Sequence, residues 1–536
     1  MTGFSGLPAL AKLAFRRDRI GLPAGAYVIV IGLASTAYTF RKLYPTQAKR
    51  LSLVTSGESN PALRFLYGRI YGTSLGSLTA WRYAVWAALF AALLAIFVVI
   101  RHTRTDEEQG RLELIGSTAV GRQAALSAAL SVSAGACLGV AALLMIVLPP
   151  LGLSAAGSVL LALAVGTCGL AFTGVAGVCA QLVSSARTAR GIALAVLGVS
   201  FVLRGTGDAA GAGSGLSWLS WISPLGWVEF ARSFGDPRWW LLGLPLALFL
   251  GGVALAFFLA GRRDLGAGLF PDRPGRPAAS VLLRGPSGLA WRLQWGTLLG
   301  WAVGYAFTFA ASGAAAQGIS QLFGTSGALQ HEFTRLGGQS AIVDAYLASL
   351  MLLAGIAGSA YAVSAVLRLR TEETGGRAEP VLAGAVGRVR WGLSHVFVAC
   401  AGTVVLLAVA GVATGLGYGL RLGGSAVGSQ TWRMLGAALA QVPAALAVAG
   451  VAVLIFGLRP RWAVPGSWTV VSLVLLLQLF GQVVELSHWV MDVSPFTHAP
   501  RLPGGTVSVA SLIWLSAAAL TLAAAGLSTL RHRDLT

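Results

Sequence analysis

The sequence predicts an all-α protein that crosses a membrane about twelve times. The chain has 536 residues, of which 56% are hydrophobic and only 11% are charged, and its mean hydropathy is +0.74. Its apolar residues form uninterrupted runs of about twenty, and at about 1.5 Å per residue such a run crosses the ~30 Å hydrocarbon core of a bilayer. A soluble core has no use for so many runs of this length.

The predicted spans alternate with short polar segments. The fifth is the least regular, because it ends in the glycine-rich "RGTGDAAGAGSG". The twelve ranges are Gly21–Phe40, Trp81–Ile100, Ala124–Leu148, Ala155–Val183, Gly191–Gly211, Trp239–Ala260, Trp295–Ala316, Ala345–Val366, Ser394–Leu416, Met434–Leu458, Val464–Leu486 and Val509–Leu530.

The net charge of +20 reflects topology and not nucleic-acid binding. Most basic residues fall in segments that are cytoplasmic if the amino terminus is cytoplasmic, as the positive-inside rule requires. The first outer loop, with Arg41, Lys42, Lys49 and Arg50, departs from the rule. We therefore expect a multi-pass plasma-membrane protein with both termini in the cytoplasm. The four cysteines lie in apolar runs, so we expect neither a disulfide framework nor a metal site.

The chain repeats itself once. The segment "RTDEEQGRLELIGSTAVGR" (Arg104–Arg122) aligns without a gap with "RTEETGGRAEPVLAGAVGR" (Arg370–Arg388), 266 residues later, with ten identities in nineteen positions. Further along, "WISPLGW" matches "DVSPFTH", and "RRDL" (Arg262–Leu265) matches "HRDL" (His532–Leu535). Repeated order at a fixed separation indicates a duplicated unit.

The duplication predicts three parts. Residues 1–260 and 289–536 each form a six-span half, and the Pro/Gly-rich segment 261–288 joins them on the cytoplasmic side. Each half opens with an amphipathic stretch, "LAKLAFRRDRI" (Leu10–Ile20) and "LAWRLQWG" (Leu289–Gly296), which we expect to lie as a helix in the membrane interface. The alternative is that these stretches are span ends with positive flanks.

The repeated charged segments follow the second span of each half. Glu107 and Arg111 are four residues apart, as are Glu373 and Arg377, and such pairs support a helix by ~0.3–0.5 kcal/mol each. Pro380 is expected to end the second of these helices near Glu379. Charged flanks that only fix topology are basic, and acidic residues contribute little to orientation. Their repetition therefore favours contact with a cytoplasmic partner.

Two six-span halves with the pattern E..GR.E after each second span resemble the membrane subunit of ABC-2 type exporters. The resemblance is closest to the actinobacterial exporters of polyketide antibiotics, of the tetronasin-resistance kind. The first outer loop "PALRFLYGRIYGTSLGSLTAWR" (Pro61–Arg82), "RGTGD" (Arg204–Asp208) and the paired "SP" segments also match that family.

The resemblance implies that each charged segment is a coupling helix, seated in a groove of a nucleotide-binding subunit. Thr374 and Gly375 replace Glu108 and Gln109, so the second contact is expected to differ. The residues that carry over are Glu107, Glu108, Arg111, Glu113 and Arg122 in the first half and Glu373, Arg377, Glu379 and Arg388 in the second.

The chain has no G-x-x-x-x-G-K-[ST] segment, and its only lysines are Lys12, Lys42 and Lys49. We expect it to catalyse no reaction and to bind no cofactor. ATP and Mg would be bound by two copies of a partner ATPase subunit, most simply a homodimer. The runner-up is an ion-driven secondary transporter, which needs carboxylates in the membrane interior. Asp208, with Arg204 one turn away, is the one candidate.

The resemblance also implies that the fifth and eleventh spans line the substrate route, each followed by a re-entrant segment. These segments would be Ser214–Phe234 and Leu486–Pro500. Polar side chains on such spans face protein or water. They would bind a large apolar drug or only hold helices together. The candidates are Phe201, Arg204, Asp208, Trp221, Gln478, Phe480, Gln482 and Glu485.

Overall fold

The structure is a computed structural model that describes residues 3–211, 213–264, 266–270, 278, 280, 285–323, 338–480 and 487–533. Throughout these residues the regular structure is helical, with no strand. Twelve of the helical segments in the described part of the chain are long and apolar enough to cross a membrane. The predicted all-α polytopic fold is confirmed.

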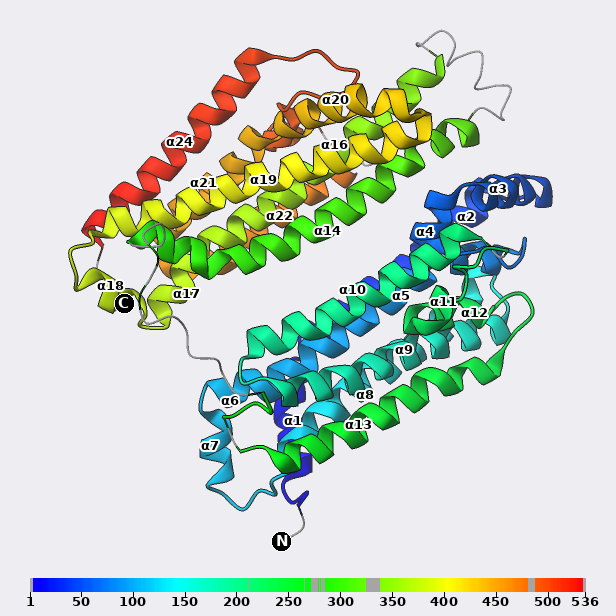
Figure 1. Cartoon of the computed structure of the whole chain (residues 1–536), viewed down its shortest axis with the longest axis horizontal. Coiled ribbons are helices and arrows are strands. Elements are labelled where there is room, and N and C mark those ends of the chain that lie inside the picture. The colour runs from blue at the N-terminus through cyan, green and yellow to red at the C-terminus, as the bar shows by residue number, and fades with distance from the viewer. Residues whose placement is uncertain are drawn as a thin grey trace. The chain divides into compact units, whose positions relative to one another are not determined.

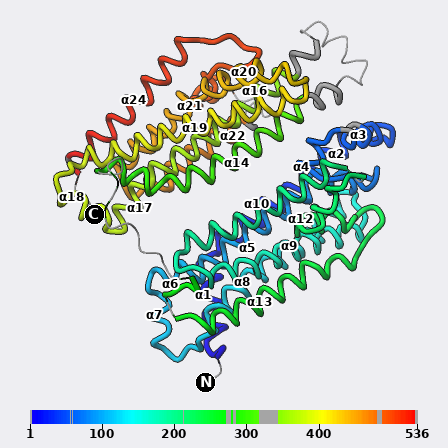
Figure 2. Tube along the Cα trace, viewed as in Figure 1, coloured from blue at the N-terminus to red at the C-terminus, as the bar shows by residue number. Residues whose placement is uncertain are grey.

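The chain forms two compact units, Met1–Gly275 and Arg276–Thr536, whose boundary falls within the predicted linker 261–288 (Figures 1 and 2). The helices of the first unit are α1 (Leu7–Arg17), α2 (Gly21–Leu43), α3 (Gln47–Ser59), α4 (Pro61–Tyr67), α5 (Leu75–Ile100), the π-helical turn η1 (Arg101–Thr105), α6 (Asp106–Glu108), α7 (Arg111–Gly116), α8 (Ala124–Val147), α9 (Ala155–Leu182), α10 (Ala186–Ala210), α11 (Leu219–Ile222), α12 (Pro224–Phe230) and α13 (Gly243–Arg262).

The core of the first unit is built around α9, which packs against α5, α8 and α13. Its sequence is rich in glycine and alanine, and small residues let membrane helices approach closely. At Gly174 a Cβ atom would lie 2.9 Å from the backbone oxygen of Phe249 in α13, so only glycine fits there.

The second unit contains α14 (Pro286–Phe323), α16 (Gly338–Val366), α17 (Arg368–Thr374), α18 (Ala378–Leu382), α19 (Arg388–Leu422), α20 (Val427–Leu439), α21 (Val442–Leu458), α22 (Ala463–Phe480), α23 (His488–Met491), the 3-10 turn η7 (Pro495–Thr497) and α24 (Val509–His532). Here α19 packs against α14, α16 and α20, and α21 packs against α24. The tenth span is interrupted between α20 and α21, where Pro443 lies in the first turn of α21 and cannot continue a preceding helix.

Each unit has two distinct ends. In the first, α6 and α7 lie at the end that carries the amino terminus, and α3, α4, α11 and α12 lie at the opposite end (Figure 1). In the second, α17 and α18 lie at the end that carries the carboxyl terminus. Both repeated charged segments are therefore at the end of their unit that also carries a chain terminus.

The two amphipathic stretches differ. Leu10–Arg17 belongs to the separate helix α1, which ends at Arg17 before α2 begins at Gly21. Leu289–Gly296 instead lies inside the continuous helix α14, so the expectation of a second separate helix is wrong. No glycine, proline or capping residue interrupts the sequence between Leu289 and Trp295, and the alternative of a span end with a positive flank is what the structure shows.

Candidate functional site

An ion-paired clasp fixes the charged segment of the first half. Its centre is Glu107, whose side chain is only 4% exposed. Arg263, directly after α13, places Nη1 2.7 Å and Nη2 3.1 Å from the two Glu107 oxygens. Arg104 places Nη1 3.1 Å from Glu107 Oε2 and also donates from Nε to the carbonyl of Ala180 in α9. Arg122 closes the clasp by donating to the Arg263 carbonyl at 3.0 Å.

The second half builds the same clasp. Glu373 is centred between Arg370, whose Nη1 lies 3.2 Å from Oε2, and Arg533, which pairs with Oε1. Arg533 also donates to the carbonyl of Phe456 in α21 at 2.8 Å. Arg388 donates to the Arg533 carbonyl at 2.7 Å. In both halves a carboxylate after the second span is thus joined to the residue that follows the last span.

Sequence reasoning missed Arg263 and Arg533 as members of the site. The repeated "RRDL" and "HRDL" segments contain them and were the signal that could have found them. In the sequence these segments indicate only duplication, because nothing in a linear sequence shows that the end of the last span returns to the loop after the second span.

The expected Glu107–Arg111 and Glu373–Arg377 helix pairs are wrong. Arg111 pairs with Asp106 at 3.0 Å and Arg377 with Glu372 at 2.9 Å, so each arginine bonds the acidic residue five positions earlier. The cause is a glycine in the left-handed region before each arginine, at φ 68° and 67°. Such a glycine ends a helix, and the two short helices on either side no longer share a face.

Pro380 does not end a helix near Glu379. It lies within α18, in the first turn, where a proline is tolerated because its missing N–H would have no partner in the helix. The structure therefore contains a short helix on both sides of the glycine in each half, α6 and α7 in the first and α17 and α18 in the second.

The exposed part of each charged segment is its second short helix. No residue of α7 is buried; Arg111 and Glu113 are exposed, and Leu114 is 74% exposed. Glu379 on α18 is also exposed. Of the predicted coupling residues, the structure buries Glu107 and Glu373 at the centres of the clasps and places Arg122 and Arg388 at their edges. The others lie at or near the surface. Their role in coupling stays a prediction.

Glu108 connects the charged segment to the fifth span. Its Oε1 accepts a hydrogen bond of 2.6 Å from the backbone N–H of Ala186, the first residue of α10. The first N–H groups of a helix have no partner within it, and a carboxylate there also interacts favourably with the helix dipole. In the second half the aligned residue is Thr374, whose hydroxyl bonds back to the Arg370 carbonyl within α17.

The opposite end of α10 holds a buried ionic junction. The Arg204 and Asp208 side chains are fully buried and form an ion pair of 3.3 Å across one helical turn. Arg204 Nη2 donates to the carbonyl of Phe65 at 2.6 Å, and Ser220 Oγ donates to Asp208 at 2.8 Å. The junction thus joins α10 to the segments around α4 and α11. Both Asp208 oxygens and both terminal Arg204 nitrogens thus have protein partners, whereas Arg204 Nε has none among the described residues.

The aromatic candidates of the fifth span lie around this junction. Phe201 is partly buried, packs edge-on against Phe65 and lies 4.9 Å below the Arg204 guanidinium. Trp221 is 41% exposed and contacts the rings of Phe230 and Trp240. Of these predicted pathway residues, Trp221 offers the most accessible surface.

In the second half, Gln478 on α22 donates to the hydroxyls of Ser494 and Thr497, both at 3.2 Å. It thereby joins the eleventh span to η7, as Asp208 joins the fifth span to α11. Gln482 and Glu485 lie outside the described residues. Phe480 is the last residue of α22, and its side chain is likewise outside the description.

Two comparisons with known proteins identify the family. The model of the C-terminal domain of the multidrug efflux system permease Rv1217c matches residues 283–531. Over 535 residues the chain is 41% identical to the multidrug efflux system permease protein Rv1217c of Mycobacterium tuberculosis, covering 99% of this chain and 96% of that protein. The chain belongs to the Rv1217c permease family. The full-length match spans both clasps, so the Rv1217c family assignment rests on the whole duplicated architecture and not on one half.

Proposed function

We propose that this chain is the membrane subunit of an ATP-driven exporter that moves hydrophobic or amphiphilic drugs out of the cell by alternating access. ATP and Mg are bound by two copies of a separate ATPase subunit. One copy contacts α7, and the other contacts α18. The relative in Mycobacterium tuberculosis is named a multidrug efflux permease, which supports the class of substrate.

The repeated clasp is the observation that carries this proposal. A buried Glu107 paired with two arginines is costly to assemble, because each charge loses its hydration. Building it twice, each time beside an exposed short helix, fits a device that transmits force between a soluble partner and the last span of each half. A segment that only fixed topology would need no such construction.

The first test addresses the partner contact on α7. Leu114→Glu introduces a charge on the exposed face without touching the clasp. A charge placed in the centre of an interface costs on the order of 1.4 kcal/mol, so we expect about tenfold weaker co-purification of the partner ATPase subunit. The matched control is Leu51→Glu on α3, an exposed leucine at the opposite end of the unit (Figure 1).

Equal loss of the ATPase subunit in both variants would contradict a contact at α7.

A second test, with the purified chain in vesicles, addresses the energy source. If it concentrates a drug in response to an ion gradient with no nucleotide hydrolysed, the proposal fails in favour of a secondary transporter.

A further inference from the structure

A pair of carboxyl groups is buried together where α12 meets α10. Glu229 on α12 and Asp208 on α10 have side chains that are 5% and 0% exposed. Both carboxyl groups lie within 4 Å of the same nitrogen, Arg204 Nη1, and they are in hydrogen-bonding contact with each other. Two carboxylates so placed repel each other, and burial penalises both charges. A single proton shared between them removes the repulsion and turns it into a hydrogen bond.

The arginines around the pair do not remove the need for that proton. Arg204 lies 3.3 Å from Asp208 but 3.9 Å from Glu229, and its other amino group is bonded to the Phe65 carbonyl. The backbone N–H of Arg69 donates to Glu229 Oε1 at 2.7 Å. The Arg69 side chain instead donates to the Gly207 carbonyl and lies 3.7 Å from Asp208. Among the described residues, no N–H or O–H group donates to Glu229 Oε2.

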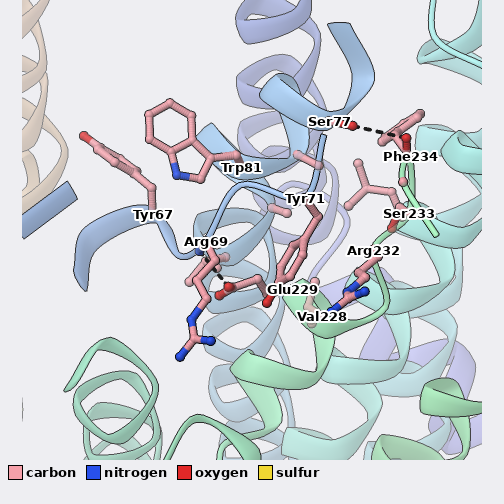
Figure 3. Close-up of a pocket in the computed structure, with 15 residues that line it drawn as sticks. Tyr67, Arg69, Tyr71, Ser77, Trp81, Val228, Glu229, Arg232, Ser233 and Phe234 are labelled. Carbon is pink, nitrogen blue, oxygen red and sulfur yellow. Dashed lines mark hydrogen bonds between the residues drawn. The ribbon is translucent and has the colours of Figure 1, made fainter. Parts of the chain in front are cut away.

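A small cavity of about 30 Å³ lies beside Glu229 (Figure 3). This volume is enough for a water molecule. Tyr71 and Arg232 also line the cavity; burial and then the Glu229 carboxylate raise the pKa of the Tyr71 phenol. Arg232 is 28% exposed and lies 3.8 Å from the exposed Asp236, so the cavity has a polar boundary toward solvent.

The backbone is shaped to admit the Glu229 carboxylate. Gly68, at φ 90°, lies so close that a Cβ atom there would be 2.2 Å from Glu229 Oε2. The second half makes the corresponding junction with the neutral Gln478 and two hydroxyl groups. Joining the span to the following segment therefore does not by itself require buried charge.

We propose that Asp208 and Glu229 form a proton-binding site, in which one shared proton holds α12 against α10. When the two elements separate, the shared O–H bond breaks, the proton passes to water in the cavity and then to solvent, and two hydrated carboxylates remain. Opening of this end of the first half thus releases a proton and is favoured by alkaline solution. This proposal does not depend on whether ATP hydrolysis or an ion gradient drives transport.

The titration behaviour of Glu229 agrees with this geometry. Burial, and then the neighbouring Asp208 carboxylate, raise the pKa of the Glu229 carboxyl well above its usual range, against the opposing effect of Arg204. A raised pKa in the folded state means that the contribution to stability is complete below the ordinary pKa of a glutamate. It is lost as the pH rises through the raised value.

Infrared spectroscopy of the full chain in lipid nanodiscs tests the proposal directly. At neutral pH we expect the carbonyl stretch of one buried, protonated carboxylic acid, which shifts slowly on exchange into D₂O. The band should be lost in Glu229→Gln and retained in Asp236→Asn, an exposed carboxylate control. A wild-type spectrum without this band at neutral pH overturns the proposal, and that measurement needs no variant to fold.

Thermal denaturation gives an independent measurement. Gln cannot ionise and imitates the protonated glutamate, so the melting temperature of Glu229→Gln should rise relative to wild type as the pH is raised from weakly acidic to weakly alkaline. Asp236→Asn should show a constant difference. A difference between wild type and Glu229→Gln that does not change with pH contradicts the shared proton.

Discussion

At the scale of single residues, Arg263 and Arg533 are more important for stability than their positions just after a helix indicate. Each neutralises a carboxylate that is almost completely removed from solvent, with side-chain exposures of 4% for Glu107 and 2% for Glu373. A buried pair adds little net stability, but removal of one partner leaves an uncompensated charge, which costs about 3–5 kcal/mol. The clasps are therefore far more sensitive to truncation than surface ion pairs.

Arg263→Ala is expected to destabilise the purified protein by about 3–5 kcal/mol, because among the described residues Glu107 then keeps only Arg104 and the Gly266 N–H as partners. The measurement is thermal or denaturant unfolding in detergent. Arg262→Ala, at the adjacent residue whose guanidinium stacks on Phe258, is the control. If both variants unfold alike, the clasp has no special role, whereas Glu107→Gln in the Arg263→Ala background should recover part of the loss.

At the scale of elements, the sequence predicts helices well and their joints poorly. The spans Ala124–Leu148 and Ala155–Val183 could be predicted to within a residue, because lipid demands continuous apolar helices with all backbone groups paired. Two other features could not be predicted in this way: that Leu289–Gly296 continues into the span as one helix, α14, and that Pro380 lies in the first turn of a helix and does not end one. Whether a polar stretch continues, breaks or restarts a helix depends on capping and tertiary contacts that no periodicity records.

The junction between α22 and η7 provides a prediction at this scale. Gln478→Leu removes two hydrogen bonds, each worth about 1 kcal/mol, and leaves the buried Ser494 without its amide partner. We expect a loss of about 1–2 kcal/mol in stability and altered drug efflux. Thr469→Val is the control, because this exposed hydroxyl on the same helix bonds only to the Pro465 carbonyl one turn away. Equal stability of the two variants would contradict the junction.

At the scale of the whole molecule, duplication was the most informative feature of the sequence. The separation of 266 residues pairs Glu107 with Glu373 and Arg104 with Arg370, and the structure gives both sets the same contacts. The exception is the charged junction of Arg204, Asp208 and Glu229, which the described residues of the second half replace with a neutral one. Its third member could not be predicted, because Glu229 reaches Asp208 only through the turn at Ser223 and Pro224.

The topology of the whole chain is testable by labelling. In a variant without cysteines, single cysteines at the exposed Ser117 and Ala385 should react with an impermeant maleimide only from the cytoplasmic side. Cysteines at the exposed Asp236 and Ser425 should react only from outside. This follows from the opposite ends of each unit and from the distribution of basic residues. Reaction of Ser117→Cys and Ala385→Cys from different sides would contradict the duplicated arrangement.

The contact between Glu108 and Ala186 has a mechanical consequence. It holds α6 to the start of a 25-residue helix that is about 37 Å long at 1.5 Å per residue and ends in the Arg204–Asp208 junction. A helix is stiff over this length, so we expect a displacement of α6 to be carried along α10 and to move the Asp208 and Glu229 carboxyl pair at its other end. The aligned Thr374 bonds within its own helix, so we expect this transmission along the helix in the first half and not through the aligned contact in the second.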